Sequence, residues 1–161
     1  MIDIRRLDNT LRYDEYDKIF LIVRSSKINN PRIIQMPELA PSQELFFMYR
    51  KWVSEGTWGQ ETFDEKYVPW FLKDLVNNPN SSRALNWIYH LSEVEEERIC
   101  LLCYCGAESM CHRSIIAGLL QGAGAHVRLV PDTKVDYSKY YSDYNYLRTF
   151  KYSDINPNFK G

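Results

Sequence analysis

The chain has 161 residues, of which 45% are hydrophobic and 14% aromatic, so it can form one ordinary buried core and is predicted to be a single domain. Its formal charge is -1, from 20 basic and 21 acidic residues, and this balance gives no overall electrostatic reason to expect nucleic-acid binding. Charged residues occur throughout the N-terminal segment, and no apolar run approaches the ~20 residues of a membrane span. We therefore expect a soluble, cytoplasmic protein that does not contact a membrane.

The first half of the chain contains extended segments followed by three helix patterns. Strands are predicted at Met1–Arg6 and at Asp17–Arg24, where apolar residues run between charged flanks, and Arg32–Met36 is expected to be extended. A helix is expected to begin after Ser42 and to end near Gly56. A second helix begins near Glu61, where Pro69 either kinks it or starts a new segment. Ser82 is the expected cap of a third helix.

The second half opens with the strongest strand pattern. Residues Ile99–Tyr104 are continuously apolar, as in a strand that is buried on both faces of a parallel sheet. The helical spacing that follows ends near Gly122, and alternation over Ala125–Val130 predicts a parallel strand after a right-handed crossover. The tail Asp136–Phe150 is predicted to be helical because four tyrosines share one face, namely Tyr137, Tyr140, Tyr141 and Tyr144.

These elements predict an α/β fold: a single-domain, Rossmann-like three-layer sandwich with a mostly parallel central sheet. Residues 1–132 would form the core domain, and residues 133–161 a tyrosine-rich helix and tail packed on it. If the tyrosine face were exposed, it would instead offer a surface to a protein partner or to a second copy of the chain.

All four cysteines lie within the twelve residues from 100 to 111, a spacing that suits a disulfide framework poorly. In an extended strand Cys103 and Cys105 point to the same face, whereas Cys100 points to the other and is expected to pack in the core. Ser109 is the expected N-cap of the next helix. Cys111 and the two residues after it would then lie in the first helical turn, where free N–H groups favour an anion.

One interpretation of this cluster is a thiol site. Cys111 is the candidate nucleophile because the helix dipole and Arg113 favour its thiolate, and His112 is a candidate acid or base. Arg113 and the helix N-terminus would hold the anion, so the candidate catalytic residues are Cys111, His112 and Arg113. The candidate ligand-binding residues are Arg24, Cys105, Ser109 and Arg113. Buried cysteines, a capping histidine and a salt-bridged arginine explain the same residues without any chemistry.

The alternative is a zinc site formed by Cys103, Cys105, Cys111 and His112. If Cys111 and His112 were both helical, their side chains would diverge by about 100°, so binding one metal ion would need non-helical geometry. The spacing of two cysteines one residue apart, then a Cys-His pair, does not match the usual zinc-finger or ribbon patterns.

Around these residues the sequence resembles the uncharacterised family catalogued as domain of unknown function 488, which occurs in bacteria, archaea and phages. The family's strand end LLCYE is matched by Leu101-Leu102-Cys103-Tyr104, its CHR helix start by Cys111-His112-Arg113, and a further segment by Leu39-Ala40-Pro41-Ser42. Cys105 stands where the family frequently has Glu, and this variant is similar to domain of unknown function 4326. The resemblance implies a compact Rossmann-like domain with a functional site at the Cys-His-Arg turn, and it names no substrate.

Three hypotheses about function follow. The first is a domain that binds or processes a phosphorylated ligand, such as a nucleotide or a nucleic-acid component, with catalysis itself left open. The second is a non-catalytic zinc-binding or protein-interaction module. The third is a phage or host-defence protein that binds a partner through its C-terminal tail. Tyrosine and tryptophan side chains between Tyr49 and Trp87 could stack on bases, although such rings more often pack in a core.

Overall fold

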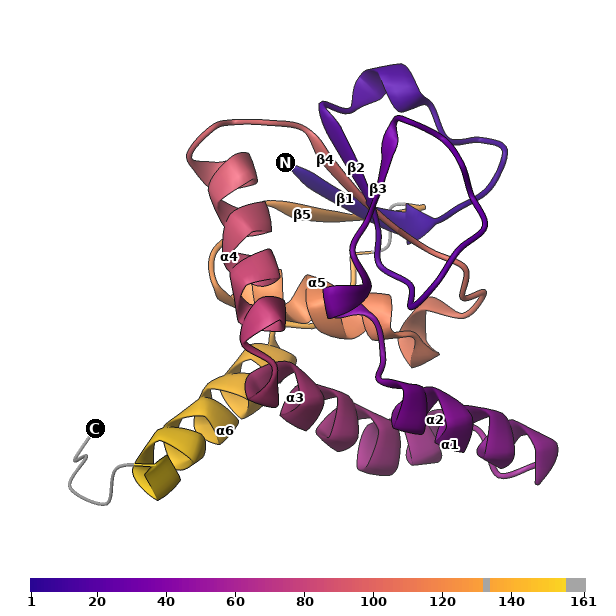
Figure 1. Cartoon of the computed structure of the whole chain (residues 1–161), viewed down its shortest axis with the longest axis vertical. Coiled ribbons are helices and arrows are strands. Elements are labelled where there is room, and N and C mark those ends of the chain that lie inside the picture. Colours follow the sequence, from indigo (N-terminus) through magenta and orange to yellow (C-terminus); the bar gives the residue numbers. More distant parts are fainter. Residues whose placement is uncertain (132–133, 156–161) are drawn as a thin grey trace.

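The computed structural model describes residues 1–131 and 134–155. Five strands form one sheet in the order β3-β2-β4-β1-β5, and every neighbouring pair is parallel. The strands are β1 (Ile2–Arg6), β2 (Lys18–Leu21), β3 (Ile33–Gln35), β4 (Ile99–Cys103) and β5 (Val127–Val130). The predicted α/β class and Rossmann-like sandwich are therefore confirmed (Figure 1).

The helices follow the predicted order. The α-helices are α1 (Gln43–Ser54), α2 (Gln60–Thr62), α3 (Val68–Asn77), α4 (Pro79–Glu93), α5 (His112–Gly122) and α6 (Lys139–Ile155). The shorter elements are the 3-10 helices η1 (Tyr13–Glu15), η2 (Pro37–Leu39) and η4 (Glu108–Met110), and the π-helical turn η3 (Phe63–Tyr67). Pro69 does not start a new segment, because Phe63, Tyr67 and Val68 all keep helical backbone angles and the helix continues from α2 through η3 into α3. The π-helical turn η3 comes directly before this proline-containing stretch.

Two of the expected helix starts are wrong. The N-cap of α4 is Asn78 and not Ser82, because the Asn78 side chain accepts a hydrogen bond from the backbone N–H of Asn80 and Pro79 occupies the first helical position. The N-cap of α5 is Cys111 and not Ser109, which lies one turn earlier in η4. Helix α1 begins directly after Ser42, as expected, and the Ser42 side chain caps it by accepting a hydrogen bond from the N–H of Leu45.

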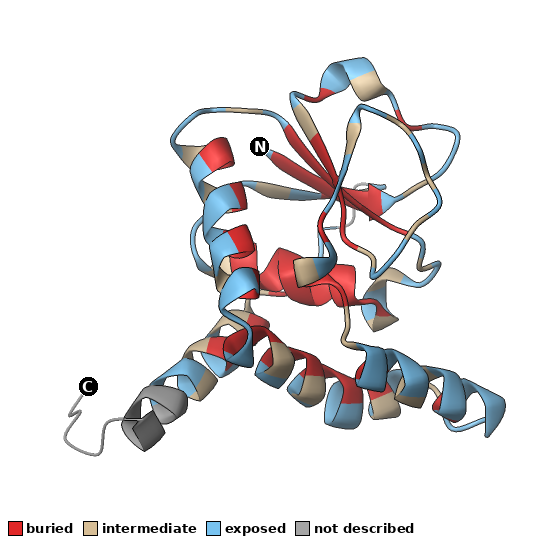
Figure 2. Ribbon diagram, viewed as in Figure 1, coloured by how far each residue is buried: buried red, intermediate tan, exposed pale blue. Residues whose placement is uncertain are grey.

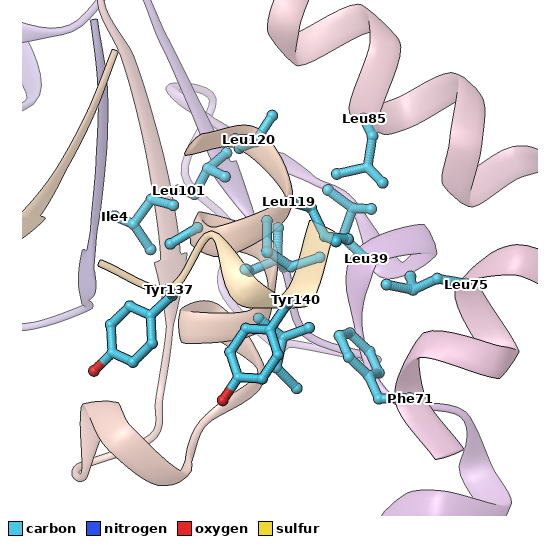
Figure 3. Packing of buried hydrophobic residues seen from close by; sticks show 14 of the residues in the cluster. Ile4, Leu39, Phe71, Leu75, Leu85, Leu101, Leu119, Leu120, Tyr137 and Tyr140 are labelled. Atoms are coloured by element: carbon cyan, nitrogen blue, oxygen red, sulfur yellow. The ribbon is translucent and has the colours of Figure 1, made fainter. Parts of the chain in front are cut away.

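The main core lies between the sheet and α5. All five residues of β4 are buried, as predicted for a strand covered on both faces. Helix α5 contacts β1, β4 and β5 on one side and α3 and α6 on the other, so it is buried all round from His112 to Leu120 (Figure 2). Figure 3 shows Leu119 and Leu120 of α5 among Ile4 and Leu101 of the sheet. The opposite sheet face, which includes Cys100 of β4, forms a second core cluster. Leu11 and Tyr16 cover it from the segment between β1 and β2, not from an α-helix.

The tyrosine face of the tail packs on α5. Tyr137, Tyr140 and Tyr144 are buried, and two glycines of α5, Gly118 and Gly122, lie directly against this segment. A Cβ atom on Gly118 would lie 2.8 Å from the carbonyl carbon of Tyr137, and closer still to its oxygen. The boundary expected at residues 132–133 lies outside the described residues, as does the end of the tail. Within the described part of the chain, none of the helices is both long and apolar enough to span a membrane.

Candidate functional site

The carboxyl ends of β2 and β4 meet at the centre of the sheet, where the chain leaves the two strands in opposite directions. From β2 the chain runs to the edge strand β3, whereas from β4 it runs through α5 to the other edge strand, β5 (Figure 1). Such a switch point is where open parallel sheets bind ligands, because the two connections leave a crevice between them. The cysteine cluster lies at this position.

Three cysteine sulfurs converge here. Cys103 is the last residue of β4, Cys105 follows it on the same face, and Cys111 caps α5. The three Sγ atoms all lie within 4.8 Å of one another, and those of Cys103 and Cys111 are 3.5 Å apart. Cys100 lies on the other face of the sheet, as predicted, and packs in the second core cluster. The three close cysteines could hold a metal ion.

The position of Cys111 explains how it can lie beside His112. Its backbone is extended (φ -128°, ψ 145°) rather than helical, and its Sγ accepts the backbone N–H of Arg113. As a result the Cys111 sulfur lies 3.6 Å from Nδ1 of His112, although the two residues are adjacent in sequence. The non-helical geometry that a shared site requires is therefore present at Cys111.

His112 is held in one orientation by the strand next to it. Its Nε2 lies 2.6 Å from the carbonyl oxygen of Ile22, which can only accept a hydrogen bond, so Nε2 carries the proton. Nδ1 then has a free lone pair, which faces Cys111 and, at 3.9 Å, Cys105. Burial lowers the pKa of His112, and the ring of Phe71 packs edge-on against it at 5.9 Å. His112 is thus a neutral ring placed to accept a proton from a thiol.

The Arg113 side chain is buried and forms hydrogen bonds within the cysteine cluster. Its buried guanidinium donates from Nη1 to Sγ of Cys103 at 3.2 Å and to the carbonyl oxygen of Cys105 at 2.6 Å. Hydrogen bonds from Cys105, Cys111 and Arg113 hold the pKa of Cys103 far below its usual range. Burial raises the pKa of Cys111 well above its usual range. These surroundings favour the thiolate of Cys103 over that of Cys111. The role of Cys111 as the nucleophile stays a prediction.

A pocket of about 250 Å³ opens in front of this cluster. Its walls are largely apolar and aromatic, and its lining includes Arg24, Phe46, Tyr49, Tyr67, Tyr104, Cys105, Cys111 and His112. Of the predicted site residues, the structure places Arg24, Cys105, Cys111 and His112 in the lining, whereas Cys103 and Arg113 lie outside it. Ser109 is exposed and not part of the lining, and its carbonyl oxygen accepts a hydrogen bond from Gln60.

The aromatic walls come partly from residues that sequence reasoning missed. Tyr49 and Tyr67 belong to the rings considered for base stacking, but Phe46 and Tyr104 were not singled out. Phe46 and Tyr104 remain 43% and 45% exposed, so part of each ring is accessible from solvent at this pocket. No periodicity along one segment brings these rings together, because they come from α1, η3 and the end of β4.

The lowered pKa of His112 makes the free energy of unfolding depend on pH. Because burial lowers its pKa in the fold, the unfolded chain binds more protons below about pH 6.5, so the free energy of unfolding falls as the pH drops through that value. We expect His112 to contribute a slope of up to about 1.4 kcal/mol per pH unit in urea-unfolding series between about pH 7 and 5. A His112→Gln variant should lose this part of the slope; an identical slope in both proteins would contradict the assignment.

One comparison with known proteins identifies a family. A family model described as the "Active DUF488-N3 subclade" matches residues 2–124, which include β1 to β4, all of α5 and every residue lining the pocket. No curated protein and no solved structure matches the chain. The similarity to domain of unknown function 4326 stays an expectation. Since this family model matches most of the sequence, the chain belongs to the domain of unknown function 488 family.

Proposed function

We propose that this chain binds a phosphorylated, ring-containing ligand of the nucleotide class in the pocket at the switch point. The observation that carries the proposal is Arg24, an exposed guanidinium in the pocket lining with no hydrogen-bond or ion-pair partner among the described residues. An arginine fork suits a phosphate, and the neighbouring rings of Phe46, Tyr49 and Tyr104 suit a planar group. Arg24, rather than the buried Arg113, is the group available to the anion.

The chemistry proposed for the site is nucleophilic attack by a pocket thiol. Cys105 and Cys111 both face the pocket and both lie near the free lone pair of His112. The S–H bond breaks as its proton moves to Nδ1, the sulfur electron pair forms a bond to an electrophilic atom of the ligand, and the departing group takes the proton back from His112. Arg113 is a positioning residue, because it fixes the carbonyl of Cys105 and the sulfur of Cys103. The matching subclade is described as active, which supports a reaction as well as binding.

Charge reversal tests the binding step. Arg24→Glu should weaken the binding of ADP, measured by isothermal titration calorimetry, by about tenfold or more, because it replaces a charge-assisted contact with a repulsive one. Lys27→Glu is a matched control, because Lys27 lies in the same segment between β2 and β3, is exposed and does not line the pocket. The same pair of variants is compared with UDP. Equal losses in the two variants, or no binding of any of these nucleotides or their sugar derivatives to the unmodified chain, would contradict the proposal.

The second candidate is a zinc centre, which the sulfur geometry specifically favours. Tetrahedral zinc with bonds of about 2.3 Å to sulfur holds its ligand atoms about 3.8 Å apart, and the sulfurs of Cys103 and Cys111 are 3.5 Å apart. Nδ1 of His112 lies 3.6 Å from Cys111, and its other nitrogen is fixed by a backbone carbonyl, as is usual for a zinc-binding histidine. Cys103, Cys105 and Cys111 would be three of the ligands. Nδ1 of His112 would be the fourth after a shift toward Cys103, since it lies near Cys105 and Cys111 but outside the group of atoms that are all within 4.8 Å of one another.

Elemental analysis separates the two candidates. A zinc centre predicts one zinc per chain in protein purified without chelators, and about none after Cys105→Ser and Cys111→Ser are combined. Less than stoichiometric zinc in the unmodified chain would remove this candidate and leave the thiols free for the reaction described above.

A further inference from the structure

A second pocket, of about 360 Å³, adjoins the first, and the two share Arg24 and Pro41 in their linings. It lies where the segment before α1 meets the turn between α3 and α4. Its character differs from that of the first pocket, because it has no aromatic ring in its lining and is bordered by polar side chains: Glu38, Ser42, Asp74, Asn77, Asn78 and Ser81. Arg24 therefore stands between an aromatic pocket and a polar one.

Asp74 is the group in the second pocket best suited to bind a ligand. Its carboxylate is half-buried and accepts one hydrogen bond at Oδ2, from the hydroxyl of Ser42 at 2.7 Å. The other oxygen, Oδ1, accepts no hydrogen bond from the residues that the structure describes. Ser42 is held in turn as the N-cap of α1, so the carboxylate has a rigid neighbour. Carboxylates of this kind accept hydrogen bonds from the ribose hydroxyl groups in dinucleotide-binding folds.

We propose that the ligand passes Arg24 and continues into this second pocket, so that it is a nucleoside diphosphate joined to a hydroxyl-bearing group such as a sugar. The inference rests on the proposed function, because it assumes that the ring and the phosphate occupy the first pocket and Arg24. The ring lies among the aromatic side chains, the phosphates contact Arg24, and the sugar hydroxyls donate to Asp74 Oδ1. Each part of the ligand then meets the side chains that match its chemistry.

Matched ligand pairs test this inference by calorimetry on the full chain. ADP is compared with ADP-glucose and UDP with UDP-glucose, because each pair differs only in the sugar. We expect the sugar-bearing member of at least one pair to bind about tenfold more tightly, and Asp74→Ala to remove that difference while leaving the affinity for the diphosphate unchanged. Glu44→Ala is the control, since Glu44 is an exposed carboxylate close to Asp74 that does not line the pocket. Asp74→Asn keeps an acceptor for Ser42 and should show a smaller loss of the same kind if Asp74→Ala unfolds.

The same titrations distinguish a failure of the second-pocket inference from a failure of the proposed nucleotide binding. If ADP or UDP binds but its sugar derivative binds no more tightly, the extension into the second pocket is wrong and the nucleotide site stands. If none of the four ligands binds, both proposals are wrong.

Discussion

Replacing Gly118 by leucine is expected to lower the free energy of unfolding by about 3 kcal/mol or more. The side chain would have to enter space that the backbone of Tyr137 and the ring of Tyr140 already occupy, and a backbone segment cannot move aside as a flexible side chain can. For a chain of this size such a loss corresponds to a fall of about 6–12 °C in the thermal unfolding midpoint, measured by circular dichroism.

Gly59→Leu is the matched control for this result. Its backbone is extended (φ -179°) and a Cβ atom there would meet nothing within 4 Å, so its midpoint should stay close to that of the unmodified chain. A Gly118→Leu midpoint no lower than that of Gly59→Leu would show that the C-terminal segment does not pack on α5 as described.

Replacing Arg113 by methionine is the second change with a large expected effect. It removes a buried donor from the Cys105 carbonyl oxygen and from the Cys103 sulfur, and hydrogen bonds of a charged group contribute about 1.5–3 kcal/mol each. The free energy of unfolding, measured in urea, should therefore fall by about 2–3 kcal/mol at neutral pH.

An arginine on the surface provides the comparison. Arg50 is exposed on α1 and does not line the pocket, so Arg50→Met should change stability by less than about 0.5 kcal/mol. Similar effects at the two positions would mean that Arg113 does not hold the thiol cluster together, and its positioning role would have to be abandoned.

The sheet and most helices follow from local sequence patterns. The apolar run Ile99–Tyr104 predicted β4 because a strand covered on both faces has no polar side to mark its alternation. The helical spacing of the tyrosines in the tail likewise predicted helix α6 and the face on which it is buried. The all-parallel arrangement follows from these strands and the segments that connect them, although no pattern within one strand indicates its neighbour.

The helix caps show where local patterns fail. Ser109 and Ser82 both have the side chain that commonly caps a helix, but the structure uses Cys111 and Asn78 instead. At α5 the choice depends on the sheet, because Cys111 lies against Cys103 of β4 and its sulfur can accept the N–H of Arg113. Such a contact joins residues from different elements, and spacing along the chain cannot indicate it.

The sequence allowed most of the polar and sulfur-containing residues of the candidate site to be predicted, but not how the site is arranged in space. Sequence spacing predicted that Cys103 and Cys105 share a face, and the sequence also indicated Arg24 as a candidate ligand-binding residue, which the structure places in the pocket lining. It did not indicate that Arg113 is buried behind the thiols, nor that Phe46 and Tyr104 border the opening. These features depend on how α1 and the connection after β2 fold back toward β4, which are contacts between distant segments.

Protection of Cys105 by a nucleotide tests the central claim most directly. Cys105 is the half-buried thiol of the pocket, so iodoacetamide should modify it in the free protein, whereas Cys100 on the opposite sheet face should stay unmodified and serve as an internal control. At an ADP concentration about ten times the dissociation constant, peptide mass spectrometry should show modification of Cys105 slowed about tenfold, and far less slowing when Arg24 is replaced by Glu. A rate of Cys105 modification that ADP does not change would contradict the claim that this pocket binds a nucleotide.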